Sequence, residues 1–160
     1  MPDINLICVG KLKEKFYADA MDEYAKRLKA FCRFSCTEIQ ENKLSDKPSK
    51  AEISRSLEKE AAFIQSSLPS DSYQIAMCVE GRSMSSEELA ALFEKLFNSG
   101  ISKISFIIGG SYGLSDEIKN SSGLKLSMSA MTFPHHLARV MVAEQIYRAF
   151  KINSGSTYHK

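Results

Sequence analysis

Continuous apolar runs alternate along this chain with stretches in which apolar residues recur at every third or fourth position. The runs at residues 4–10, 73–81 and 103–110 are typical of strands that are covered on both faces of a sheet. Two weaker runs of similar length, at 33–39 and 124–129, indicate further strands. The pattern therefore predicts five strands spread over most of the chain.

The segments between these runs have the apolar spacing of amphipathic helices. Apolar residues recur at helical spacing over 17–31, 53–68 and 89–97. Ser85 and Glu88 match a capping box, in which each residue satisfies a backbone N–H group of the other at the start of a helix. Three amphipathic helices are therefore expected between the first and the fourth strand.

Two more helices are expected in the C-terminal part. One starts at Ser115, and the last starts near Pro134, because the first turn of a helix accepts proline. Strands and helices thus alternate throughout, which predicts an α/β fold with a parallel sheet flanked by helices. A length of 160 residues fits a single domain that spans 1–160.

Composition and charge narrow the class of protein. The chain is 44% hydrophobic and 25% charged, and no apolar run approaches the roughly 18 residues of a membrane span. No basic region precedes the first apolar run, which argues against a signal peptide. We therefore expect a cytoplasmic protein without membrane contact.

The spacing of the cysteines argues against a disulfide or a zinc site, and the net charge argues against a surface that binds nucleic acid throughout. In a strand, Cys32 and Cys36 would lie roughly 13 Å apart at about 3.3 Å per residue, too far for a disulfide, and no second pair has zinc-like spacing. We expect structural cysteines and no metal. A net charge of +2 argues against wholesale binding of nucleic acid, although Lys11, Lys13 and Lys15 form a local basic cluster.

Ligands of a parallel sheet bind beyond the carboxyl ends of its strands, and the loop after Ile108 contains three glycines, Gly109, Gly110 and Gly113. Glycine lets the backbone approach a ligand closely, so this loop is predicted to bind one. No lysine follows to make a phosphate-binding Walker loop.

The same loop reads Gly109-x-Ser111-x-Gly113, the pattern of the nucleophile elbow in serine hydrolases. A histidine from the C-terminal part could then serve as the base. However, the elbow of a hydrolase leads straight into its helix, whereas the helix here begins four residues after Ser111, at Ser115. The hydrolase is kept as an alternative.

The last helix places His135 and Arg139 four residues apart, on one face of an otherwise apolar helix. A buried arginine needs a partner because an unpaired, desolvated charge is costly. Two explanations stay open. Arg139 could form an interface ion pair, for example with Glu144 of a neighbouring subunit, or it could contact an anionic or nucleic-acid ligand.

Several segments together resemble a known family. The segments "GKLKEKF", "EGRSMSSEELA", "FIIGGSYGL", "MTFPHHLARVMVAEQIYRAFKI" and the final "YHK" are similar to the RlmH family, small SPOUT-class methyltransferases that act on a pseudouridine of 23S ribosomal RNA. The resemblance runs from the first strand to the last residue. It implies a SPOUT fold with a C-terminal trefoil knot, a rare exception to unknotted topology. It also implies a homodimer packed through the last helix.

The resemblance further implies that S-adenosylmethionine is the cofactor and that the methyl group goes to N3 of the pseudouridine, on the assembled large subunit or the 70S ribosome. By position, the cofactor site comprises Met77, Gly109, Met128, Ser129, Ala130, Met131, Thr132 and Phe133. Two residues depart from the family pattern. His136 stands where glutamine is expected, so it receives no catalytic role, and Tyr112 is bulkier than expected in its loop.

Candidate catalytic residues are His135, Arg139, Tyr158 and His159, with the general base left unassigned. Lys11, Lys13, Lys15 and Lys160 are the candidates for RNA contacts. In a dimer, the tail with Tyr158 to Lys160 could cross into the cofactor pocket of the other subunit. A cofactor-binding or RNA-binding module without turnover remains the alternative of another class.

Overall fold

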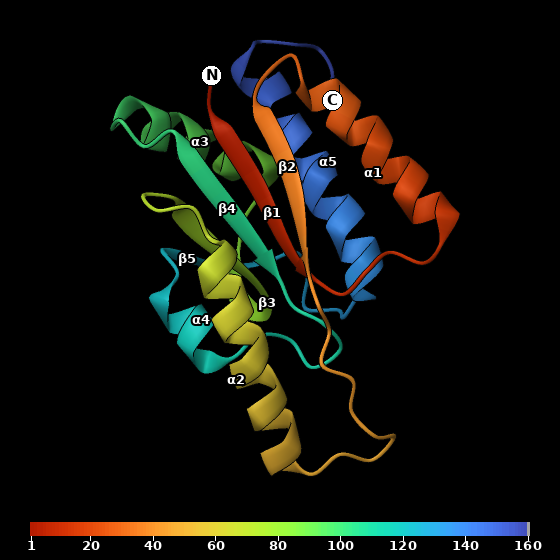
Figure 1. Cartoon of the computed structure of the whole chain (residues 1–160). Coiled ribbons are helices and arrows are strands. Elements are labelled where there is room, and N and C mark those ends of the chain that lie inside the picture. Colours follow the sequence, from red (N-terminus) through yellow and green to blue (C-terminus); the bar gives the residue numbers. More distant parts are fainter. Residues whose placement is uncertain (160) are drawn as a thin grey trace.

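The computed structural model of the protein describes residues 1–159. Five strands form one sheet in the order β2-β1-β4-β3-β5, and every pair of neighbours is parallel (Figure 1). All carboxyl ends therefore lie at the same edge of the sheet. The strands are β1 (Asp3–Val9), β2 (Arg33–Ile39), β3 (Tyr73–Ser83), β4 (Lys103–Ile108) and β5 (Leu124–Ser127).

Helices cover both faces of the sheet. Figure 1 shows α1, α3 and α5 on one face and α2 and α4 on the other. The longest, α5, packs between α1 and α3. The helices are α1 (Lys15–Leu28), α2 (Lys50–Ser67), α3 (Ser86–Asn98), α4 (Asp116–Ser121) and α5 (His135–Asn153).

Each face of the sheet has its own apolar core, because side chains of a strand alternate between the two faces. Ile4 and Leu6 of β1 belong to the larger core beneath α1, α3 and α5, while Ile7 and Val9 belong to the smaller core beneath α2 and α4. In the larger core the ring of Phe93 meets that of Phe150 edge to face, with centroids 5.6 Å apart. This three-layer arrangement confirms the predicted parallel sheet flanked by helices.

The predicted helix starts are largely confirmed by their caps. Ser85 and Glu88 form the expected capping box, and the Ser115 side chain caps α4. A second capping box, between Ser49 and Glu52, was not predicted and starts α2 at Lys50, three residues before Ile53, where the predicted apolar stripe begins.

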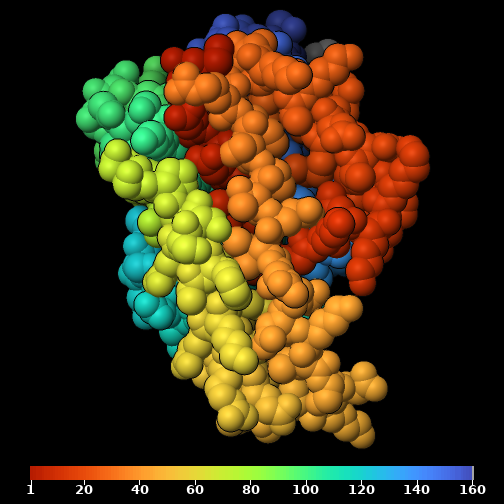
Figure 2. All heavy atoms as spheres, in the orientation of Figure 1, coloured from red at the N-terminus to blue at the C-terminus, as the bar shows by residue number. Residues whose placement is uncertain are grey.

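The polar segment at 40–49 forms a projection beside α2 (Figure 2). Two residues of α2 hold it in place. The Ser56 hydroxyl donates to the Asn42 carbonyl, and the Glu60 carboxylate accepts from the Asn42 backbone N–H at 3.2 Å. Burial raises the pKa of the Glu60 carboxyl. The polar composition of this segment predicts a mobile loop, but its first part is attached to the helix that follows.

Threading of the C-terminal segments through a loop, as the trefoil knot requires, stays a prediction. Across residues 1–159, no helix is long and apolar enough to cross a membrane. The same part of the chain contains no group of three or more His, Cys, Asp or Glu residues arranged to hold a metal ion.

Candidate active site

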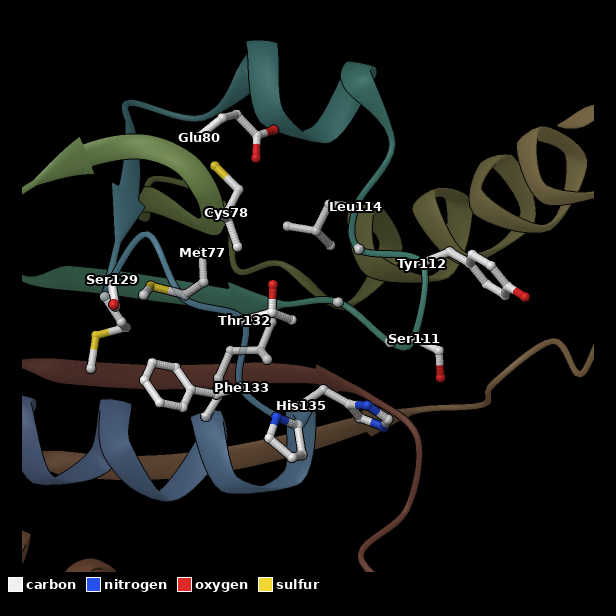
Figure 3. A pocket seen from close by; sticks show the side chains of 18 of the residues that line it. Met77, Cys78, Glu80, Ser111, Tyr112, Leu114, Ser129, Thr132, Phe133 and His135 are labelled. Carbon is white, nitrogen blue, oxygen red and sulfur yellow. The ribbon is translucent and has the colours of Figure 1, made fainter.

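A cavity of about 700 Å³ lies at the carboxyl ends of β3, β4 and β5. Three segments supply most of its wall, namely 77–80, 108–114 and 128–135 (Figure 3). They include the glycine loop after Ile108 and the cofactor residues that the family resemblance implied. Seven of the eight predicted cofactor residues line the cavity: Met77, Gly109, Met128, Ser129, Met131, Thr132 and Phe133. The eighth, Ala130, is absent from its lining.

An irregularity in β3 brings residues 77–80 into the wall. The strand pairs with β5 up to Met77, shifts register, and pairs again from Arg82. Gly81 makes this possible, since a Cβ there would lie 2.8 Å from the Leu126 backbone. Within the shifted stretch, Glu80 accepts a hydrogen bond of 2.6 Å from Lys119 of α4, which also lines the cavity.

The glycine loop after β4 folds back on itself. The backbone N–H of Gly113 donates to the Gly110 carbonyl at 3.0 Å, and Gly113 has a positive φ of 78°. A Cβ at Gly109 would lie 2.5 Å from the carbonyl carbon of Gly113. Gly109 is therefore required by the shape of the turn itself, whereas the sequence suggested close approach of a ligand.

Ser111 does not have the surroundings of a hydrolase nucleophile. It is exposed, and within residues 1–159 its hydroxyl makes no hydrogen bond to a histidine. Figure 3 shows Ser111 and Tyr112 at one side of the glycine loop, with the Tyr112 ring directed away from Met77. Helix α4 is capped by Ser115, so no strand-to-helix elbow forms at Ser111.

The segment between β5 and α5 is held by its own serines. The Ser127 hydroxyl donates to the Ser129 carbonyl, and the Ser129 hydroxyl accepts from the Met131 backbone N–H, both at 3.0 Å. Met131 is 73% exposed although it borders the cavity. Its apolar side chain is therefore available to cover a ligand.

His135, the first residue of α5, lines the same cavity. Its Nε2 atom is buried and has no hydrogen-bond partner in the part of the chain that the structure describes. Burial, helped by the neighbouring His136, lowers the pKa of His135. The imidazole is therefore neutral near pH 7, with a buried nitrogen free to accept or donate one hydrogen bond.

Arg139 lies one turn further along α5 and is only 1% exposed. Its Nη1 donates to Glu38 at the end of β2 at 2.7 Å, and its Nη2 donates to the Gly10 carbonyl at 2.9 Å. Glu38 also accepts from the Leu12 backbone N–H at 3.1 Å. The partner of Arg139 is thus Glu38 of the same chain, whereas Glu144 bonds to Arg148.

The ion pair is reflected in the pKa of the Glu38 carboxyl. Burial acts to raise this pKa, but the hydrogen bonds from Arg139 and Leu12 outweigh it and lower the pKa. No pattern in the sequence pointed to Glu38, which lies 101 positions away from Arg139. The rule that sites form at the carboxyl ends of parallel strands would have included it, had β2 been placed beside β1.

The basic cluster lies beside the start of α5. Lys11 and Lys13 are exposed and form no ion pair within residues 1–159, while Lys15 pairs with Asp19 at 2.7 Å. Glu14 approaches His136 at 3.5 Å. Figure 1 shows this loop running past the first turn of α5. Lys160, the fourth predicted RNA contact, lies outside the described residues.

The C-terminal tail lies at the other end of α5 (Figure 1). The Tyr158 hydroxyl donates to Glu144 at 3.1 Å, and the two ring nitrogens of His159 lie 3.2 Å from Arg148 and 2.6 Å from Glu87. Burial and the Glu144 contact raise the pKa of Tyr158. A single chain therefore brings His135 and Arg139 together near the cavity and leaves Tyr158 and His159 away from it.

Comparison with known proteins agrees with this geometry. Residues 3–159 match the family described as "Predicted SPOUT methyltransferase". The chain is 48% identical over 158 residues to ribosomal RNA large subunit methyltransferase H of Clostridium acetobutylicum and 47% identical to the protein of the same name from Clostridium novyi. In both cases 99% of each chain is covered.

Solved structures support the fold alone. A "probable methyltransferase" of Bordetella pertussis superposes with a TM-score of 0.55 at 13% identity, covering 92% of this chain and 95% of that one. A "probable methylase family protein" of Haemophilus influenzae gives a TM-score of 0.53 at 15% identity, covering 98% of this chain and 70% of that one. The family match and the full-length relatives show that this chain is a methyltransferase of the SPOUT family, in the branch of the ribosomal RNA large subunit methyltransferases H.

Proposed function

We propose that this enzyme transfers the methyl group of S-adenosylmethionine to N3 of a pseudouridine in 23S ribosomal RNA, within the large subunit or the 70S ribosome. The observation that carries the proposal is the cavity at the carboxyl ends of β3, β4 and β5, in a chain 48% identical along its length to a ribosomal RNA large subunit methyltransferase H. The acting unit is a single domain spanning 1–160 that works as a cytoplasmic homodimer.

The residues present fit the cofactor. A volume of about 700 Å³ lies within the range of about 300–1,000 Å³ that is usual for small-molecule sites. Met77, Met128 and Phe133 offer apolar surface for a flat aromatic base, and the glycine loop and the segment after β5 offer backbone groups for its polar edge. When bound, S-adenosylmethionine supplies an electrophilic methyl group carried by a sulfonium.

His135 is the best-placed residue for the proton of the target base. The imide N3–H must lose its proton before or as N3 becomes bonded to carbon, and a base has to lie within hydrogen-bond reach of it. The neutral His135 imidazole borders the cavity, and its buried Nε2 lacks a partner within residues 1–159. We assign the His135 imidazole as the acceptor of that proton, which requires the ring to turn so that one of its nitrogens faces the cavity.

Arg139 does not contact the reacting groups in this proposal. Its guanidinium is committed to Glu38 and to the Gly10 carbonyl, so it fixes the start of the basic loop against α5. Lys11 and Lys13 then face solvent beside the cavity, where they can contact phosphate groups without reading sequence. Arg139 is a positioning residue in this proposal, and the lysines supply local charge.

Tyr158 and His159 reach a cavity only in the dimer. In one chain they lie at the far end of α5, docked on Glu144, Arg148 and Glu87. We propose that the tail of one protomer completes the cavity of its partner, where Tyr158 and His159 grip the extruded base by stacking and hydrogen bonding.

The test is a methyl-transfer assay with labelled S-adenosylmethionine on 70S ribosomes, large subunits and extracted ribosomal RNA, all from cells that lack this enzyme. His135→Ala should lower kcat by about a hundredfold or more, because general bases contribute on the order of 10²–10⁴. Its affinity for S-adenosylmethionine should stay within about threefold, since the proton acceptor contributes little to cofactor binding. Mass spectrometry of nuclease digests locates the product.

Three outcomes would contradict the proposal. The first is a methyl group on a ribose or on a base other than pseudouridine. The second is full activity of His135→Ala, which would remove the assigned base. The third is cofactor binding without transfer to any of the three substrates, which would point to a binding module.

A further inference from the structure

A row of aromatic rings leads from the surface of α1 to the cavity. The rings of Phe16 and Tyr17 have centroids 4.4 Å apart, Tyr17 and His136 are 6.5 Å apart, and His136 and His135 are 4.2 Å apart. The row ends at His135, which lines the cavity. Four rings from two helices thus form a continuous path to the candidate active site.

The outer end of the row is unusual for a folded protein. Phe16 is 65% exposed, one of the most exposed large apolar side chains of the chain. It lies in the first turn of α1, three residues after Lys13 and one after Lys15. An exposed aromatic ring close in sequence to the exposed Lys11 and Lys13 suits a ligand that has both flat apolar faces and negative charge.

The position of this row is fixed by contacts to the loop before α1, the strongest of which come from the buried Arg139. Arg139 and Glu38 hold Gly10 and Leu12, and through them the loop that leads into α1. Glu14 approaches His136 from the same loop at 3.5 Å. Phe16 and Tyr17 are therefore held beside α5, in register with its first turn.

We propose that Phe16, Tyr17 and His136 form a stacking track for the single-stranded RNA that adjoins the methylated nucleotide, with Lys11 and Lys13 on its phosphates. The inference rests on the proposed function and adds to it the residues that receive the flanking bases. Proteins bind single strands by combining cations along the backbone with aromatic rings on which bases stack. Bases beside the target that are single-stranded need aromatic surfaces on which to stack, and the track offers such surfaces next to His135.

A second copy of the chain is the competing occupant for an exposed ring. In a two-fold dimer with its axis near Phe16, Lys11 and Lys13 of each protomer would lie close to their equivalents in the other. Like charges at close range disfavour such a contact, whereas RNA phosphates are complementary to them. The charge beside the ring therefore favours RNA over a second copy.

The test compares two exposed phenylalanines in the full-length protein. Phe16→Ala removes the outer ring of the track, and Phe63→Ala removes a ring that is 56% exposed on α2, on the opposite face of the sheet. The probe is a short single-stranded oligouridine that carries one 2-aminopurine, whose fluorescence is quenched by stacking. Phe16→Ala should weaken binding about tenfold, which is about 1.4 kcal/mol, and relieve the quenching.

Two further variants separate stacking from general structure. Phe16→Trp keeps a ring and should restore affinity and quenching, while Phe63→Ala should match the wild type throughout. Replacing Lys11 and Lys13 by alanine should reduce the slope of log affinity against log salt by about 1.4, because each phosphate that a cation neutralises on a single strand contributes about 0.7 to that slope. Sedimentation analysis should show an unchanged dimer in every variant.

The outcomes distinguish this inference from the proposed function. If wild-type enzyme methylates ribosomes and Phe16→Ala behaves like Phe63→Ala in binding and activity, the track is refuted and the proposed function stands. A dimer weakened by Phe16→Ala would assign the ring to a subunit interface and also refute the track. If ribosomes are not methylated but quenching depends on Phe16, the proposed function fails and RNA stacking survives.

Discussion

The two ends of α5 hold their neighbours in different ways. At its first turns, Arg139 bonds to a carboxylate from β2 and to a backbone carbonyl at the end of β1, and it is 1% exposed. Towards its last turns, Arg148 bonds to Glu144 of its own helix and to His159 of the tail. The first arginine joins parts of the core, whereas the second holds only a terminal segment.

The contacts of Arg139 are part of the folded core, whereas the contacts of the tail can be exchanged for others. Contacts of Arg139 lie between strands and helices that the whole fold fixes. The tail contacts Glu144 and Arg148, whose side chains are 19% and 24% exposed. Such contacts are weak enough to be broken in favour of others. We therefore expect the cavity end of α5 to be preformed and the tail end to be conditional.

The largest effect is expected at the cavity end, from Gly109→Ala. Its Cβ would meet the Gly113 backbone, which cannot move aside without opening the turn. Affinity for S-adenosylmethionine, measured by calorimetry, should fall at least about a hundredfold, which is about 2.7 kcal/mol. The matched control is Gly110→Ala, whose Cβ would meet side chains and no backbone, namely Val9 at 3.2 Å and Glu41 at 3.7 Å. This variant should bind within about threefold of wild type. Equal affinities for the two variants would show that the turn is not preformed.

The two arginines provide the second test. Arg139→Met should lower the free energy of unfolding by about 2 kcal/mol, because it removes the hydrogen bonds of a buried guanidinium and leaves the Gly10 carbonyl without its donor. Arg148→Met should cost about 1 kcal/mol or less, since its surroundings are partly solvated. Urea denaturation measures both. Decreases of equal size would mean that the tail is as firmly held as the core.

The third test removes the tail. Deletion of Tyr158 to Lys160 should leave the dimer, the free energy of unfolding and the affinity for S-adenosylmethionine nearly unchanged, because the cavity is lined by other segments. Methylation of ribosomal subunits should fall by at least about tenfold, or about 1.4 kcal/mol in transition-state stabilisation. A shortened enzyme with full activity would leave the tail a purely structural appendage of α5.

The regular part of the fold could be predicted from the sequence because its signals are local. The apolar pattern of a buried strand or an amphipathic helix can be recognised within a few residues. A cap such as Ser85 with Glu88 is complete within four positions. The cavity segments followed from one general rule, since ligands bind at the carboxyl ends of parallel strands. The family resemblance then named individual residues in those segments.

What could not be predicted depends on contacts between distant positions. The register shift in β3 exists because Gly81 meets the backbone of β5, and the pattern at 73–81 reads as one unbroken strand. The partner of Arg139 was unpredictable for a similar reason, because only the order of β1 and β2 in the sheet brings Glu38 to α5. The docked tail is polar and has no periodicity, so its contacts with Glu144 and Glu87 left no pattern.

The smallest effect expected is the acid sensitivity that Glu38 gives to the cavity end. The folded protein lowers the pKa of Glu38 below its ordinary value of 4.5, so its ion pair stabilises the fold above about pH 4.5. That contribution is lost as the pH falls from there through the lowered pKa. Glu38→Gln keeps an acceptor for Arg139 and Leu12 but removes the charge.

In urea denaturation between about pH 3 and 7, the wild type should therefore exceed Glu38→Gln by about 1 kcal/mol or less at neutral pH, because the carboxylate is 38% exposed and screened by solvent. The two curves should converge towards the acid end. Glu58→Gln, at an exposed position of α2 without an ion pair within residues 1–159, should follow the wild type at every pH. A difference between wild type and Glu38→Gln that stays constant down to pH 3 would mean that the shape of the side chain, and not its charge, holds the loop at Gly10.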